Sequence, residues 1–123
     1  MPIVQHDPER PNAVISIDQG DTGRLVVEPF DFPGGRCAGG TVDLTPFQGG
    51  PFRLYLEADG SLNMDLYRDH YWLLAEAILP ERRFEQEPTG RVDEYGQPVM
   101  EMVERPLDLN EVDIVVFSLP EVN

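Results

Sequence analysis

The residues with the clearest chemical potential lie close together in the middle of the chain. Within a dozen positions the chain carries four oxygen donors and one imidazole, at Asp59, Asn63, Asp65, Asp69 and His70. Carboxylate and amide oxygens bind hard cations, and an imidazole beside a carboxylate is able to transfer protons. The alternative is that these residues only cap and turn the polar side of a hairpin and a helix.

The spacing of this cluster does not match the common metal-binding patterns. An EF-hand loop that began at Asp59 would need glycine at its sixth position and glutamate at its twelfth, where the chain has Met64 and His70. A di-iron helix needs Glu-x-x-His, whereas this segment offers only His70 and Glu76. The two histidines, His6 and His70, are too far apart in sequence for a His-x-x-x-His pair. We therefore expect no metal and no cofactor, although a site assembled from residues distant in sequence stays open.

Cys37, the only cysteine, is a second chemical candidate. It lies in GGRCAGGT, where glycines give access and the positive charge of Arg36 favours the reactive thiolate; His70 is a candidate base for a Cys-His pair. The alternative, which we favour, is an inert small apolar side chain. A single cysteine excludes an intramolecular disulfide and the usual cysteine-ligated zinc or iron–sulfur sites.

The remaining catalytic chemistry is poorly represented. The chain has no lysine, which excludes Schiff-base chemistry, a P-loop and a protein-kinase site. No serine lies in a Gly-x-Ser-x-Gly motif, and carboxylates are too abundant here to indicate glycoside hydrolysis. We therefore predict no catalytic residues and favour a non-enzymatic protein.

The charge of the chain restricts its partners. The chain has 23 acidic and 9 basic residues, a formal net charge of −14. Such a surface repels phosphate backbones and anionic lipid, so no nucleic-acid or membrane partner is expected. Apolar runs of about five residues are too short to span a membrane, and the N-terminus does not resemble a signal peptide, so the expected location is cytoplasmic.

Twelve prolines divide the chain into short elements, because proline neither continues a helix nor donates to a sheet. We expect a flexible N-terminal arm over 1–12 and a single globular domain over 13–123. Asp59-Gly60 predicts a hairpin turn, and 89–98 is polar and turn-rich. Apolar runs and alternation predict strands at 13–17, 24–30, 41–47, 52–58, 62–67, 82–88, 99–105 and 112–119.

One helix is predicted over 70–79. An apolar stripe with helical spacing runs through Tyr71, Leu74, Ala75 and Ile78. Asp69 is placed to cap the first turn, and Pro80 ends the segment. The alternative begins the helix at Asn63 and removes the strand at 62–67.

These elements predict an α+β, mostly-β domain with an antiparallel sheet, sandwich or partly open barrel. It would contain about seven short strands, with the helix covering one side or end. Small, acidic, proline-punctuated, mostly-β proteins occur among phage and prophage assembly components. This likeness of fold class makes a phage structural component one form of the functional hypothesis.

The favoured function is a protein-interaction or assembly module that binds itself, as a homo-oligomer, or another protein. Aromatic residues on exposed loops mark contact surfaces, and the alternative is that they fold back as a lid over the sheet. The predicted partner-binding residues come from the Gly/Pro-rich region 29–52 and the loop 89–98, and are Phe30, Phe32, Arg36, Phe47 and Tyr95. The second hypothesis is a small ligand- or cation-binding domain, or a minor enzyme, with a pocket near 70–79.

Overall fold

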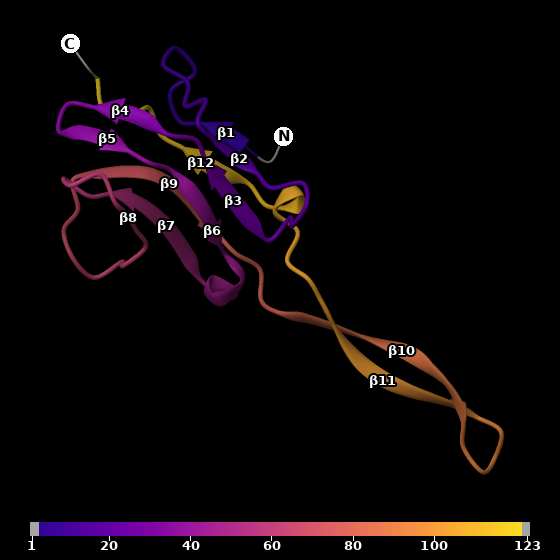
Figure 1. Cartoon of the computed structure of the whole chain (residues 1–123). Helices are drawn as coiled ribbons and strands as arrows, with labels where there is room; N and C mark the ends of the chain where they lie inside the picture. The colour runs from indigo at the N-terminus through magenta and orange to yellow at the C-terminus, as the bar shows by residue number, and fades with distance from the viewer. Residues whose placement is uncertain (1–2, 122–123) are drawn as a thin grey trace.

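The computed structural model describes residues 3–121, which consist mainly of β-strands and loops (Figure 1). The main sheet has five strands. In spatial order they are β1 (Ile3–Gln5), β12 (Ile114–Val116), β9 (Trp72–Ile78), β7 (Pro51–Leu56) and β8 (Leu62–Asn63). β1 and β12 are parallel, and the other neighbours are antiparallel.

The remaining strands form one smaller sheet and two hairpins. β2 (Ile15–Ile17), β3 (Arg24–Val27) and β6 (Gly40–Asp43) make a three-stranded antiparallel sheet. β4 (Phe30–Phe32) pairs with β5 (Gly35–Cys37). The last pair, β10 (Arg83–Val92) and β11 (Pro98–Arg105), projects away from the body as a long arm (Figure 1). Two single-turn 3₁₀ helices, η1 (Thr45–Phe47) and η2 (Leu109–Glu111), complete the described elements.

One hydrophobic core joins the two sheets and the β4–β5 hairpin. Side chains alternate between core and surface along each strand, as the two-residue period of a strand requires. The buried positions include Ile15, Ile17, Leu25, Val27, Phe30, Phe32, Phe52, Leu54, Leu56, Ile114 and Val116. The prediction of a mostly-β fold with antiparallel sheets is therefore confirmed, and the described sheets form no closed barrel.

The predicted helix over 70–79 is wrong, because Trp72–Ile78 forms β9 in the middle of the main sheet. The alternative helix that began at Asn63 is also wrong, since Leu62–Asn63 forms β8. The expected apolar stripe does not face one side: Leu74 is fully buried, whereas Ile78 is 75% exposed.

A β-bulge explains why this strand has an apolar spacing that resembles a helix. Ala75 pairs with Leu54 and Leu73 pairs with Tyr55, so Leu74 is the extra residue between two consecutive partners on β7. An extra residue breaks the two-residue alternation. Leu74 and Ala75 are consequently both buried although they are adjacent in sequence.

Most other predicted strands exist with different boundaries. The hairpin turn predicted at Asp59-Gly60 is present, but its loop has three residues instead of the two that this sequence pair favours; Gly60 has a positive φ of 92°. The predicted strand at 62–67 ends at Asn63, whereas β10 extends to Val92, into the segment predicted as a turn. β4 and β5 lie in the Gly/Pro-rich segment, for which no strand was predicted beyond Phe30.

The prediction of a flexible N-terminal arm over 1–12 does not hold for residues 3–5, because they form β1 and pair with β12. Residues 1 and 2 lie outside the described part of the chain. Gln5 closes the loop that runs from β1 to Asn12. Its side chain accepts a hydrogen bond from the Asn12 backbone N–H at 2.7 Å and donates one to the Asn12 carbonyl at 3.0 Å. Asn12 is itself buried, and its amide donates to the Phe117 carbonyl at 2.9 Å.

Short acidic and amide side chains shape most of the loops. In each case a side-chain oxygen accepts a hydrogen bond from the backbone N–H two residues later, which is an Asx-turn. The residues are Asp7, Asn12, Asp18, Asp21, Asp43, Asp59, Asn63, Asp65, Asp93 and Asp108. Part of the acidic excess therefore forms turns, independently of any ligand.

Replacing Asn12 by alanine tests whether this buried Asx-turn connects the N-terminal segment to the core. Asn12→Ala leaves the Phe117 carbonyl and the Val14 N–H without their side-chain partners, and we expect a loss of about 2 kcal/mol in unfolding free energy. Chemical denaturation measures this loss. Asn63→Ala, which removes a more exposed Asx-turn, is the matched control and should cost less than about 1 kcal/mol. Equal losses in the two variants contradict the connecting role.

Candidate functional site

The five residues predicted to bind a partner do not form one surface. Phe30 and Phe32 are 6% and 3% exposed and belong to the core, so for them the alternative of folding back over the sheet holds. Phe47 is partly buried and packs edge-on against Phe52, with ring centroids 5.3 Å apart. Arg36 is exposed and bonds Asp31 across the β4–β5 hairpin at 2.8 Å. Among these five residues, Tyr95 is the one exposed aromatic, with 80% of its side chain accessible in the loop between β10 and β11.

This difference in burial has a direct consequence for mutagenesis. Phe32→Ser removes a buried ring and leaves a cavity, so we expect a loss of at least about 3 kcal/mol in unfolding free energy. Tyr95→Ser removes an exposed ring and should change it by less than about 0.5 kcal/mol. Thermal or urea denaturation of both variants checks the contrast. A fully stable Phe32→Ser variant contradicts the core assignment of β4.

Cys37 is not an accessible nucleophile, because its side chain is buried at 1% exposure in the core cluster. It lies in β5 directly opposite Phe30. The expectation that neighbouring glycines expose it is therefore wrong, and the favoured alternative of a small apolar core residue agrees with its position.

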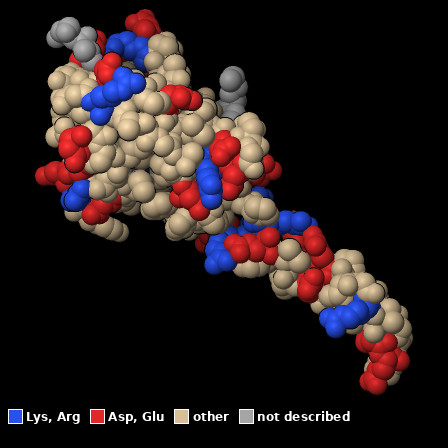
Figure 2. Space-filling view, in the orientation of Figure 1, with Lys and Arg blue, Asp and Glu red and all other residues tan. Residues whose placement is uncertain are grey.

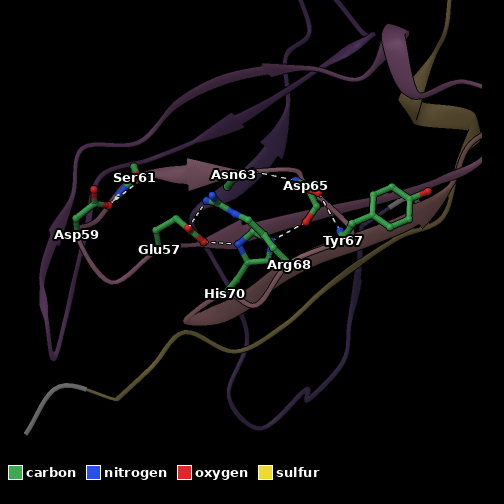
Figure 3. A network of polar contacts seen from close by, with 8 residues as sticks. All are labelled: Glu57, Asp59, Ser61, Asn63, Asp65, Tyr67, Arg68 and His70. Carbon is green, nitrogen blue, oxygen red and sulfur yellow. Dashed lines mark hydrogen bonds and ion pairs between the residues drawn. The ribbon is translucent and has the colours of Figure 1, made fainter.

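His70 is the centre of a polar cluster that closes the segment from β7 to β9 (Figure 3). Its Nδ1 faces Oε1 of Glu57, and its Nε2 lies 2.6 Å from the backbone carbonyl oxygen of Asp65. The second oxygen of Glu57 accepts from Arg68 at 2.6 Å. The ring of Tyr55 stacks on the imidazole at a centroid distance of 3.9 Å.

The other members of the predicted acid cluster have local roles. Asp59 accepts from the backbone and hydroxyl of Ser61, and Asn63 and Asp65 form consecutive Asx-turns. Asp69 is exposed and caps no helix, since none begins there. Within residues 3–121, no three His, Cys, Asp or Glu side chains are grouped so that they could hold a metal ion.

The geometry around His70 suits a structural clasp better than proton transfer. Both ring nitrogens face oxygen acceptors, so the imidazolium form satisfies both contacts, and no ring nitrogen is left for a substrate. Burial of the ring lowers the pKa of His70 and is the largest single influence. The hydrogen bonds to Glu57 and to the Asp65 carbonyl, together with the negative charge of Glu57, outweigh it, so the pKa of His70 is raised.

The raised pKa makes the clasp sensitive to pH. The contribution of His70 to stability is complete below its unfolded pKa of about 6.5 and is lost as pH rises through the higher folded pKa. The melting temperature of the wild type should therefore fall more between about pH 6 and pH 8 than that of His70→Gln, which does not titrate. Calorimetry on both proteins across this range measures the difference. Parallel pH profiles contradict a protonated clasp.

A surface groove of about 700 Å³ lies beside the C-terminal end of β9. Most of its lining residues are apolar, and its polar lining comes from Arg53, Glu76, Glu111 and Asp113. The sequence hypothesis of a pocket near 70–79 corresponds to this position, although the neighbouring element is a strand. The apolar lining residues are Pro51, Phe52, Ala77, Ile78, Leu79, Pro80, Val112 and Val115.

The arm is the feature that sequence reasoning missed. Most of the large apolar side chains of the arm are exposed. The exposed ones are Phe84, Val92, Tyr95, Met100 and Met102. The alternation of Met100 and Met102 with Val99 and Val103 was recognisable in the sequence. Nothing in the sequence showed that this strand would leave the body.

No protein-family model, curated protein or solved structure matches this chain. In the described residues, no helix has the length and apolar character needed to cross a membrane.

Proposed function

We propose that this protein is a non-enzymatic assembly module that contacts another protein subunit through the β10–β11 arm. The observation that carries the proposal is that not one residue of the two arm strands is buried. An isolated two-stranded hairpin is only marginally stable in water, and three strands or a packed face are needed for independent stability. A second protein surface would supply the missing contacts.

One face of the arm is mainly apolar, although Glu104 lies opposite Phe84 on it, and the other face is mainly charged. Residues directly opposite in an antiparallel pair point to the same side, and the pairs Gln86–Met102 and Pro88–Met100 therefore share a face. Phe84, two residues before Gln86, lies on the same side. An apolar face on a projecting hairpin is the kind of exposed patch that marks a protein contact.

The opposite face is charged and pre-organised. Arg105 pairs with Glu85 across the strands at 2.7 Å and also contacts Glu87. Each exposed ion pair contributes at most about 1 kcal/mol, so these pairs orient the arm without making it stable alone. Side chains of both charges cover the arm (Figure 2), which keeps the unpartnered hairpin in solution and limits random edge pairing.

At the base of the arm, Arg82 contacts Phe84 and Glu104, which lie opposite each other on the same face. Its guanidinium donates twice to Glu104 at 2.6 Å and lies 5.7 Å from the centre of the Phe84 ring. This contact covers part of the apolar face and holds Phe84 in position. A pre-formed contact surface loses less conformational entropy on binding than a flexible one.

The alternative of a ligand- or cation-binding domain has less support. The mainly apolar lining of the groove disfavours a cation, and no metal-ligating cluster exists among residues 3–121. A structural component of a phage or prophage particle is one form of the assembly proposal, because such particles are built by contacts between protein subunits.

Site-specific photo-crosslinking tests the proposal in the cells that produce the protein. A photoreactive residue in place of Met102 probes the apolar face, and the same residue in place of the neighbouring Glu101 is the matched control on the charged face. We expect a protein adduct from Met102 at several times the yield from Glu101. Equal yields, or no adduct at either position, contradict a contact through the apolar face.

A further inference from the structure

Two unpartnered apolar surfaces lie on the same chain. The first is the arm face with Phe84, Met100 and Met102. The second is the groove, where Ile78 is 75% exposed at the end of β9. Both expose large aliphatic or aromatic side chains, so each is a suitable contact surface for the other.

The groove adjoins the base of the arm. Glu111 lines the groove and accepts from Arg83, the first residue of β10, at 3.0 Å. Pro80, which also lines the groove, lies three positions before β10. Because the arm points away from the body (Figure 1), it does not cover the groove of its own chain.

We propose, as a refinement that depends on the proposed function, that the partner of the arm is a second copy of this chain. Two copies lie side by side with their arms antiparallel. The arm of each copy crosses the groove at the base of the other arm. The contact has twofold symmetry, since each copy donates one arm and one groove.

The area that a stable dimer needs favours this reciprocal arrangement. Specific interfaces bury about 800 Å² on each partner, and the few apolar side chains of a single arm face fall short of that. An exchange of arms uses both surfaces of both copies. It therefore doubles the buried area without further elements and covers the arm face with Phe84, Met100 and Met102 together with Ile78 of the groove.

One charge pair is available across such a contact. Arg91 is the one arginine that makes no ion pair with the described residues, and it lies near the far end of the arm. Among the groove carboxylates, Glu76 pairs with Arg53 and Glu111 with Arg83, whereas Asp113 makes no ion pair with the described residues. Arg91 would meet Asp113 on the partner. The tip also carries Asp93, whose carboxylate is occupied by the Tyr95 and Gln97 backbone N–H groups, and Glu94.

The net charge of −14 on each copy opposes association, and this repulsion is screened by salt. The dimer should therefore be tighter at high than at low ionic strength. An interface dominated by ion pairs would respond in the opposite direction. Salt dependence thus separates an apolar contact from a charge-driven one.

The test is the absolute mass of the purified full-length chain, measured by light scattering over a range of protein and salt concentrations. The wild type should be a dimer. Met102→Glu on the arm and Ile78→Glu in the groove should each weaken dimerisation at least about tenfold. Tyr67→Glu, an equal charge change at a 93%-exposed aromatic of the body, is the matched control and should leave the mass unchanged. All three positions are exposed, and circular dichroism verifies folding.

Mixing the two interface variants gives the sharpest result. Met102→Glu keeps an intact groove and Ile78→Glu keeps an intact arm, so a mixed pair retains one complete arm–groove contact. We expect the mixture to form more dimer than either variant alone. An arm-to-arm dimer that does not use the groove would be insensitive to Ile78→Glu, and that insensitivity overturns the exchange.

Two other outcomes also overturn the inference. A monomer at every concentration rules out a second copy as the occupant; if Met102 still forms its adduct in cells, the assembly function stands with a different partner protein. A mass above the dimer rules out the closed twofold arrangement. Failure of the exchange is therefore distinguishable from failure of the assembly function, which the crosslinking yield at Met102 decides.

Discussion

The pairing of β9 with β7 on one side and β12 on the other is the contact on which the rest of the structure depends. It joins the two halves of the chain in the centre of the main sheet. The chain leaves the body after β9, forms the arm and returns through η2 to β12, which pairs with β9 at Val115↔Glu76. The arm is therefore a long excursion between two adjacent antiparallel strands (Figure 1). Its base is anchored by two adjacent strands of the main sheet, β9 and β12.

This anchoring separates two kinds of stability within one chain. The body has a continuous apolar core, in which side chains of β3, β7, β9 and β12 are inaccessible to solvent. The arm has exposed cross-strand pairs and ion pairs, whose contributions are small. Elements with few buried contacts are the ones that open or rearrange first. Binding to a partner surface would therefore change the stability of the arm most and the stability of the body least.

Acidic residues contribute to the fold in several ways. The negative net charge by itself is therefore weak evidence for a bound ligand. Many aspartates form Asx-turns, Glu57 holds His70 and Arg68, and glutamates on the arm pair with arginines. Among residues 3–121, acidic side chains pair with eight of the nine arginines, and Arg91 makes no such pair there. The polar cluster at 57–70 is thus a device that closes a loop, and the surfaces without partners are apolar.

Sequence alone determined the features that depend on local geometry. The alternation in β7, the Asp59-Gly60 turn and the mostly-β class follow from the two-residue period and from the conformational freedom of glycine. Tertiary structure decided the rest. The bulge at Leu74 exists only against β7, the burial of Phe30 depends on the facing sheets, and the exposure of Met102 results from an arm that leaves the body. Each depends on which distant segments pack together, and an alternating or helical spacing in one segment carries no information about that.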